Sequence, residues 1–288
     1  MTGAGGDPSA PERFVDLHMH STASDGALPP GEVVAAAHRA GLGAIALTDH
    51  DTVDGLNEAR RAGDALGVRV VPGIELSAID DGDERHVLGL HLSHPEHLAA
   101  ALAELRETRR ERAKTTVALL NSLGVPVTLE AVYVEAGDGA VGRPHIARAL
   151  VAGGWARDFR DAFDRWLGNG KPACVEKRTV TFAEASRLIH ESGGLAIYAH
   201  PGGSASRAEL AALAALGLDG VEVRHPSHTA DEMARLAAFA DELGLVPSGG
   251  SDWHGATEGY RSLGSMQVSA RWLEQQDERV RQRAVQPA

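Results

Sequence analysis

The sequence predicts a parallel α/β fold whose sheet is either open or closed into a barrel. Short apolar runs alternate with Ala-rich stretches of helical periodicity along most of the 288 residues. Repeated strand–helix units of this kind are typical of parallel sheets. Glycine follows several of the helical stretches, at the position where a helix commonly ends.

Seven strands and five intervening helices are expected. Each strand is a short apolar run, and the strands cover residues 14–20, 44–49, 68–75, 86–92, 195–200, 221–223 and 245–251. The helical patterns between them cover residues 31–39, 55–66, 182–192, 207–216 and 230–243. Gly41, Gly67, Gly217 and Gly244 close four of these helices.

One stretch breaks the alternation. From residue 96 to 175 helical patterns dominate, with a long helix to Asn121 and shorter ones over 144–152 and 157–167. We therefore expect a helical insertion in one barrel or sheet domain, which would cover residues 13–95 and 176–269. Residues 270–288 are expected to form a charged helix or tail. Residues 1–12 are rich in Gly, Pro and Ala, which favours a flexible tail over a signal peptide.

The composition argues against several classes of function. A net charge of −12 does not suit wholesale binding of nucleic acid, which requires a basic surface. The single cysteine, Cys174, rules out an intramolecular disulfide and fits a reducing cytoplasm, where we expect the protein to act. No run approaches the roughly 18 apolar residues of a membrane span. Basic residues over 106–114 alternate with Glu107 and Glu111, so we expect a solvated helix face there.

Two segments carry pairs of metal-seeking side chains at positions i and i+2. His18 and His20 alternate with Leu17 and Met19, and Asp252 precedes His254 by two residues. In an extended chain this spacing points both side chains to the same side. Buried imidazoles without partners are costly, so a metal centre is the interpretation we favour.

Further polar residues fall where the predicted strands end. They are His50 within Asp49-His50-Asp51, Glu75 and His200, whereas His86 starts its strand. The carboxyl ends of parallel strands form one rim, where active sites gather. Asp25 is either a further ligand or a turn cap before Gly26. The histidines at 38, 91, 94, 97 and 190 are interpreted as ordinary surface or packed residues.

The mixture of ligands indicates the kind of metal. Imidazole and carboxylate without thiolate suit Mn, Fe or Zn. Seven to nine ligands exceed the needs of one ion, so we expect two or three divalent ions, with manganese favoured. Such clusters are typical of phosphoryl hydrolysis.

Taken together and in order, these segments resemble the motifs of the PHP (polymerase and histidinol phosphatase) family. They are Asp16-Leu17-His18-Met19-His20-Ser21, Thr48-Asp49-His50-Asp51, Gly73-Ile74-Glu75, Ala199-His200-Pro201 and Gly250-Ser251-Asp252 with His254. The resemblance implies a distorted (β/α)7 TIM-like barrel with a trinuclear metal site. It assigns His18, His20, Glu75 and Asp252 to one ion, Asp25, His50 and His254 to a second, and Glu75, His86 and His200 to a third.

The insertion is similar to that of small stand-alone members of this family. The segments are Gly142-Arg143-Pro144-His145-Ile146-Ala147 and Gly170-Lys171-Pro172-Ala173. In that subgroup, enzymes hydrolyse nucleoside 3′,5′-bisphosphates, 5′-nucleotides or short RNA 5′ ends. We expect Arg143, His145 and Lys171 to bind substrate, with Arg143 as a phosphate fork. Alternatively, Arg143-Pro144 is only the start of a helix.

The sequence thus predicts a metal-dependent phosphoesterase that acts on a phosphate monoester of a nucleotide-like substrate. A metal-bridging hydroxide would attack, Asp252 and Arg143 would assist catalysis, and His225 would bind phosphate or protonate the leaving oxygen. The alternatives are a 5′→3′ exonuclease on short RNA, a phosphatase of histidinol phosphate or another metabolite, and a non-catalytic metal-binding module. Neither a membrane nor an obligate protein partner is expected.

Overall fold

The structure is a computed structural model that describes residues 14–80, 82–137, 141–175 and 180–285. The predicted tail over residues 1–12 and the last three residues of the predicted C-terminal segment lie outside the described residues. So do residues 176–179, where the second part of the barrel is expected to begin.

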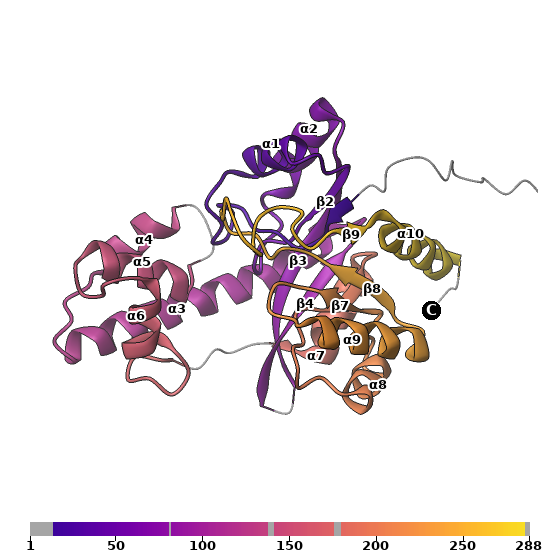
Figure 1. Cartoon of the computed structure of the whole chain (residues 1–288). Coiled ribbons are helices and arrows are strands. Elements are labelled where there is room, and N and C mark those ends of the chain that lie inside the picture. The colour runs from indigo at the N-terminus through magenta and orange to yellow at the C-terminus, as the bar shows by residue number, and fades with distance from the viewer. Residues whose placement is uncertain (1–13, 81, 138–140, 176–179, 286–288) are drawn as a thin grey trace, which may run out of the picture.

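Seven strands form a TIM-like barrel, as predicted (Figure 1). They are β1 (Phe14–Asp16), β2 (Ala44–Leu47), β3 (Arg69–Asp80), β4 (Asp83–Leu90), β6 (Leu195–Tyr198), β7 (Gly220–Arg224) and β8 (Val246–Gly249). Their order in the sheet is β8-β7-β6-β4-β3-β2-β1. The seam between the two ends is held by Leu17, whose backbone N–H donates to the carbonyl of Gly249 at 3.1 Å, and by a parallel bridge from Met19 to Trp253.

Strand β4 corrects the expectation of a parallel sheet. It pairs antiparallel with β3 and with β6. The pairs β1–β2, β2–β3, β6–β7 and β7–β8 are parallel, and β1 and β8 meet at the closing seam. Strands β3 and β4 form a hairpin, and Gly82 has a φ of +88° at its turn. Because β4 runs backwards, its first half lies at the rim where the parallel strands end. His86 therefore belongs to that rim, although it lies in the middle of β4 rather than at its start.

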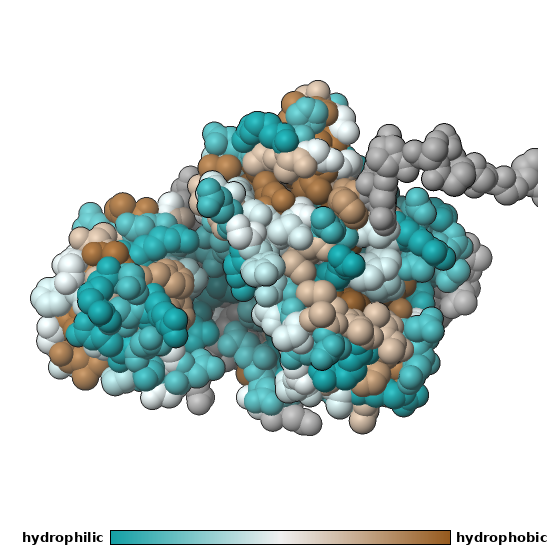
Figure 2. Space-filling view, in the orientation of Figure 1, coloured by the Kyte–Doolittle hydropathy of each residue, from teal (hydrophilic) through white to brown (hydrophobic). Residues whose placement is uncertain are grey.

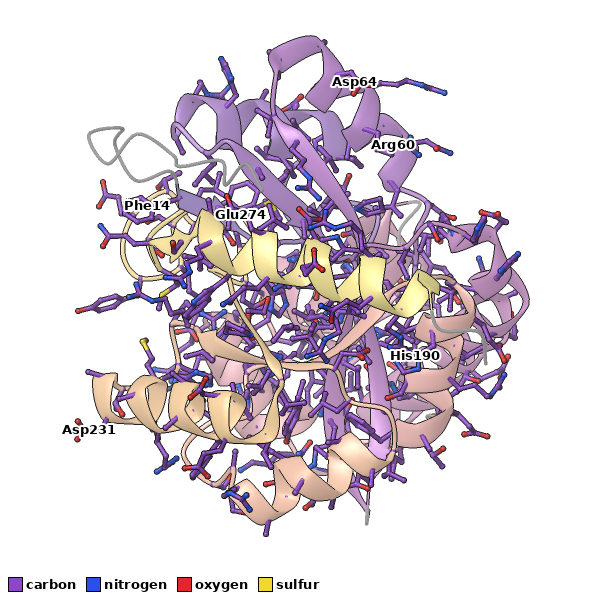
Figure 3. The ribbon with its side chains drawn as sticks, turned by 90° about the vertical axis from the view of Figure 1, so that its right-hand side faces the viewer. Phe14, Arg60, Asp64, His190, Asp231 and Glu274 are labelled. Atoms are coloured by element: carbon purple, nitrogen blue, oxygen red, sulfur yellow. The ribbon has the colours of Figure 1, made fainter. Side chains whose placement is uncertain are left out.

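The helices around the barrel follow the predicted pattern. They are α1 (Pro30–Arg39), α2 (Leu56–Leu66), α7 (Phe182–Glu191), α8 (Arg207–Ala215), α9 (Ala230–Leu243) and α10 (Ala270–Val285). Gly67 and Gly244 end α2 and α9 with φ values of +71° and +65°. Helix α10 crosses the outside of the barrel beside β8 (Figure 3). Among the described residues, no helix combines the length and apolar character needed to cross a bilayer.

The sequence did not indicate two short strands. Strand β9 (Val268–Ser269) pairs antiparallel with β1, and β5 (Val180–Thr181) pairs with the end of β3 that extends beyond the barrel. Both pairings depend on tertiary contacts that a two-residue pattern cannot reveal.

The helical segment between β4 and β5 forms a lobe beside the barrel (Figure 1). It contains η1 (Pro95–Leu98), α3 (Ala99–Ser122), α4 (Leu129–Ala136), α5 (Arg143–Ala152), α6 (Phe159–Ala162) and η2 (Phe163–Leu167). Its hydrophobic cluster, which includes Leu120, Ile146 and Leu150, draws only on this segment. Helix α4 was not predicted; it begins at Thr128, whose hydroxyl accepts a hydrogen bond from Ala131 N–H.

Candidate metal centre

All nine predicted metal ligands gather at one end of the barrel. They come from the chain after β1 (His18, His20 and Asp25), after β2 (His50), from β3 (Glu75) and β4 (His86), and from the chain after β6 (His200) and β8 (Asp252 and His254). These nine side chains are called the metal cluster below. The fold therefore brings together, from six strands, side chains that lie far apart in the sequence.

Glu75 lies at the middle of this cluster and is buried. Its Oε2 lies 3.3 Å from His18 Nε2, 3.2 Å from His20 Nε2 and 3.2 Å from His50 Nδ1. Its Oε1 lies 2.8 Å from His86 Nδ1 and 3.1 Å from His200 Nε2. One carboxylate thus faces five imidazoles, three on one oxygen and two on the other, which is the arrangement of a bridging ligand.

Two further carboxylates complete the cluster. Asp252 Oδ1 lies 3.4 Å from His18 Nε2 and 3.3 Å from His20 Nε2. Asp25 Oδ1 lies 3.2 Å from His254 Nε2, and its Oδ2 lies 3.9 Å from His50 Nε2. Asp25 is therefore oriented by the cluster and not only by the turn before Gly26.

The positions of the buried imidazoles are better explained by ligation of a metal ion than by hydrogen bonds among the side chains. Both ring nitrogens of His20 and Nδ1 of His50 are buried without a hydrogen bond, although carboxylate oxygens lie near them. Two ligands held about 2.0–2.2 Å from one ion lie roughly 3 Å apart, and these nitrogen–oxygen pairs are 3.2–3.3 Å apart. The donor set of imidazole and carboxylate suits a divalent transition metal.

The pKa values of the buried groups also favour a bound metal ion. Burial alone would raise the pKa of Glu75, but His50, His86 and His18 outweigh it and hold this pKa well below its usual range. Burial would lower the pKa of His20, yet Asp252 and Glu75 raise it to about 10. The carboxylates are thus anionic and demand compensating positive charge, which a metal supplies without protonating the imidazoles.

A second layer of carboxylates orients the cluster. Glu222 on β7 accepts a hydrogen bond from His18 Nδ1 at 3.0 Å, so that Nε2 of this ring faces Glu75. Asp16 accepts from the backbone and hydroxyl of Ser251 at 2.9 and 2.7 Å. Sequence reasoning missed these roles. An acidic residue between the apolar Val221 and Val223 was the available signal for Glu222.

Backbone strain also concentrates here. His200, Asp252 and Asp51 have φ values of +32°, +50° and +50°. Such values are uncommon for residues with a side chain and are maintained only by the surrounding structure. The turns that follow β2, β6 and β8 are therefore fixed in conformations that aim side chains at the rim.

A pocket of about 350 Å³ opens onto the metal cluster. Besides cluster ligands it is lined by His225, Ser227 and Arg261. His225 Nδ1 accepts from Ser227 N–H at 3.1 Å, which leaves Nε2 to carry the proton of the neutral ring, 3.4 Å from Asp252 Oδ2. Arg261 donates to the same Oδ2 at 2.5 Å. Both groups are placed to contact a ligand beside the cluster. No motif in the sequence indicated Arg261.

The insertion contacts the metal centre through two arginines. Arg109 of α3 is buried and donates through Nε to Asp51 Oδ2 at 2.6 Å. Arg148 of α5 donates to the backbone carbonyl of Asp25 at 2.7 Å. The expectation of a solvated face over residues 106–114 is therefore wrong for Arg109. The helix is solvated on its outer side, where Arg110 and Glu107 lie, but docks against the barrel on the other.

The structure does not bring the predicted substrate residues of the insertion into the metal pocket. Arg143 donates to Asn169 Oδ1 at 2.9 Å and lies in a neighbouring cavity. His145 is buried and accepts from Gly142 N–H at 3.0 Å, at the start of α5. Burial, together with Arg148 and Arg109, lowers the pKa of His145 to about 4. Lys171 is exposed. Contact of all three residues with substrate stays a prediction.

Comparison with known proteins agrees with this geometry. The PHP domain family matches residues 16–168. A 5′-3′ exoribonuclease of Haemophilus influenzae is 38% identical over 83% of this chain and 89% of its own. A 3′,5′-nucleoside bisphosphate phosphatase of Chromobacterium violaceum is 37% identical over 87% of this chain and 90% of its own.

A solved structure extends the match to the whole fold. The protein, described as a metal-dependent phosphoesterase from Bifidobacterium adolescentis, has a TM-score of 0.85 and 31% identity. The alignment covers 95% of this chain and 98% of that one. The function of this chain is accordingly that of a hydrolase, a metal-dependent phosphoesterase. With its motifs, its barrel and its relatives in agreement, the chain belongs to the PHP domain family.

Proposed function

We propose that the protein hydrolyses a phosphate monoester of a nucleotide-like substrate, either a nucleoside 3′,5′-bisphosphate or a 5′-nucleotide. The position of Glu75 among five imidazoles carries this proposal, because one ion cannot use so many ligands. Two or three divalent ions would be held by the metal cluster, with manganese favoured. The substrate class rests on the relative from Chromobacterium violaceum.

Divalent ions at the cluster would supply positive charge for the phosphoryl oxygens and activate the attacking water. The chain contributes the remaining functions. Asp252 both faces the cluster and contacts His225 and Arg261, so it links the metal ligands to the substrate pocket. Arg261 carries a guanidinium at the mouth of the pocket, where it can bind a phosphoryl oxygen.

His225 is the group we assign to the leaving oxygen. Its Nε2 carries the proton in the neutral ring and faces the pocket, while Ser227 fixes the ring from the other side. Protonation of a departing nucleoside oxygen needs a donor in this place. Positioning by Ser227 ensures that the proton lies on the nitrogen that faces the reaction.

A second candidate function is 5′→3′ exonuclease action on short RNA. The relative from Haemophilus influenzae, which carries that name and matches over most of its length, favours it. Both reactions hydrolyse a phosphate ester at a terminal phosphate group of the substrate or next to it. The acidic chain favours short substrates over long ones. A non-catalytic role is less well supported, because all nine expected ligands are present.

The test is a substrate panel with manganese-loaded protein. It includes adenosine 3′,5′-bisphosphate, AMP, histidinol phosphate and a 5′-phosphorylated oligonucleotide. We expect hydrolysis of the bisphosphate or mononucleotide, and its loss in the His20→Ala variant. Preference for histidinol phosphate would contradict the substrate class, and no hydrolysis of any ester by metal-loaded protein would favour a non-catalytic module.

A further inference from the structure

A second group of metal-seeking side chains lies outside the metal cluster, in the segment that connects β4 to α3. It consists of His94, Glu96 and His97, and one donor atom from each of the three lies within 4.8 Å of the others. The last residue of β4, just before this segment, pairs with the first residue of β6. His200 of the metal cluster follows the other end of β6. The three side chains therefore lie at the end of the barrel opposite to the metal cluster.

The backbone of this segment holds the two imidazoles side by side. His97 N–H donates to the carbonyl of His94 at 3.1 Å, which closes a 3₁₀ turn at the start of η1. Side chains three residues apart are eclipsed in such a turn. The two rings are accordingly stacked, with centroids 5.1 Å apart and planes inclined by 19°. Glu96 Oε1 lies 3.3 Å from His94 Nδ1, and two ligands of one zinc ion are separated by about the same distance.

Contacts with the end of α7 select the nitrogen of His97 that can bind a metal. His97 Nδ1 lies 3.0 Å from the backbone carbonyl of Glu191. A carbonyl oxygen only accepts, so Nδ1 carries the proton and Nε2 keeps the lone pair. Histidines that bind metals usually donate their other ring nitrogen in this way. The N–H groups of Ser93 and His94 both donate to the carbonyl of Ser192 at 3.0 Å, so the backbone of the segment is fixed.

The electrostatic surroundings of this group favour a cation. Glu191 is the last residue of α7, and the carbonyl groups at the end of a helix carry partial negative charge. The pKa of Glu96 lies below its usual range, mainly because its own backbone N–H donates to it, with smaller contributions from His94 and His97. Within the described part of the chain, neither lysine nor arginine forms an ion pair with Glu96. An anionic carboxylate thus faces two imidazoles without a competing cation from a described side chain.

An ion in this place would act on the insertion. Helix α3 begins directly after the segment, beside the barrel, and extends into the insertion (Figure 1). On the face shown in Figure 2, a mainly hydrophilic hollow separates the insertion from the barrel. The contact between the two parts is therefore incomplete, and the anchor at the start of α3 contributes to the position of the insertion.

We propose that His94, Glu96 and His97 bind a zinc ion, with water as the fourth ligand, and are not ordinary surface residues. Two imidazoles and one carboxylate are a known donor set for zinc. Because the side chains of His94 and Glu96 are exposed, they can rotate into a coordination sphere without disturbing the packing. The ion would join the end of α7 to the start of α3 and so stabilise the insertion. This site is separate from the ions proposed for the metal cluster and does not depend on the proposed function.

The test counts zinc ions in the wild-type protein and in the variants His94→Ala and His97→Ala. Equilibrium dialysis against buffered micromolar free zinc, followed by elemental analysis, gives the number of ions per chain. We expect each variant to hold one zinc ion fewer than the wild type. His38→Ala is the matched control, because His38 is an exposed histidine in the last turn of α1. Its zinc content should equal that of the wild type.

The metal cluster would also take up zinc, so the count is repeated in the His20→Ala background. The difference of one ion between His20→Ala and His20→Ala/His94→Ala should persist there. Equal zinc contents with and without His94 in both backgrounds would overturn the site. Zinc should raise the Tm of His20→Ala but not that of the double variant, and equal responses would contradict stabilisation of the insertion. Neither measurement requires hydrolysis, so a failure of the proposed function leaves this test intact.

Discussion

Arg109 of the insertion and Asp51 of the barrel form a buried ion pair one residue after the metal-cluster residue His50. Arg109 Nε lies 2.6 Å from Asp51 Oδ2, and Asp51 Oδ1 accepts from Ser77 N–H at 3.2 Å. The contact ties the long helix α3 to the turn after β2 and to β3. The insertion is thus fixed to the metal centre by charge.

Removal of one partner should destabilise the protein strongly. Arg109→Met removes the guanidinium that pairs with the buried Asp51 carboxylate, at a cost of about 3–5 kcal/mol in the free energy of unfolding. Chemical denaturation measures this change. The double variant Arg109→Met/Asp51→Asn should recover much of it, and Arg110→Met should change stability by less than about 0.5 kcal/mol. Equal instability of the single and double variants would contradict an ion-pair role.

Glu222→Gln should weaken metal binding without removing a metal ligand. The amide keeps the size of the side chain but loses the charge that orients His18. Loss of such an outer partner typically lowers metal affinity about 10- to 100-fold. Competition with a fluorescent chelator measures the affinity. The exposed Glu258→Gln serves as control, and equal affinities of both variants would show that Glu222 has only a packing role.

Chelation should lower the thermal stability of the protein. The metal cluster collects anionic carboxylates at a buried site, and a ligand that binds only the folded state stabilises it by mass action. We expect Tm to fall by roughly 5–15 °C after dialysis against a chelator. The Tm of His20→Ala should respond less. Elemental analysis of loaded protein should give more than one transition-metal ion per chain. Active protein that contains at most one ion per chain would contradict the multinuclear centre.

His225→Gln should separate leaving-group protonation from phosphate binding. With a nucleotide substrate we expect kcat to fall about 100-fold, the scale of general acid catalysis. With a nitrophenyl phosphate the loss should be under about fivefold, because that leaving group departs without a proton. Equal losses would assign His225 to phosphate binding instead. His190→Gln on α7, whose imidazole contacts Asp219, is the control.

The docking of α10 should depend on pH through His91. Burial is the main cause that lowers the pKa of His91 below its usual 6.5, against the opposing effects of Gln276 and Asp277. The imidazole is therefore neutral in the folded protein, and its contribution to stability is present above about pH 6.5 and lost as the pH falls.

The variant His91→Asn tests this dependence, because asparagine tolerates the left-handed backbone at φ +63°. Urea unfolding from about pH 7 to 5, with chelator present throughout, gives the comparison. Wild-type stability should fall toward that of the variant as the pH is lowered. A constant difference between the two proteins would exclude titration of His91.

The sequence was sufficient to predict the barrel and to select the nine side chains that gather at its rim, whose role as metal ligands stays a prediction. Short apolar runs reveal strands, and pairs such as His18 with His20 stand out because buried imidazoles need a partner. The direction of β4 could not be inferred, since a strand shows the same two-residue period in either direction. Only pairing with β3 and β6 shows why His86 reaches the rim.

The missed residues share one physical property. Arg109, Glu222 and Arg261 are single charged residues outside any motif. The partners of Arg109 and Glu222 lie 58 and 204 positions away in the sequence, and Arg261 reaches Asp252, nine positions away, only through the fold of the loop between them. A charged residue on a helix or strand suggests a solvated position until the packing of another element is known. The contact between insertion and barrel therefore had no local signal, whereas the metal motifs did.

The seam between β1 and β8 has a consequence for the nascent chain. Asp16 accepts a hydrogen bond from Ser251 across 235 positions, and the predicted metal ligands Asp252 and His254 follow directly. A closure between such distant positions forms only after most of the chain is in place. A nascent polypeptide that does not yet include residue 254 lacks at least one of these two residues. The hydrogen bonds that close the barrel between β1 and β8 cannot form before the last strand is present. Hydrolytic capacity is therefore withheld during synthesis and arises in the step that completes the barrel.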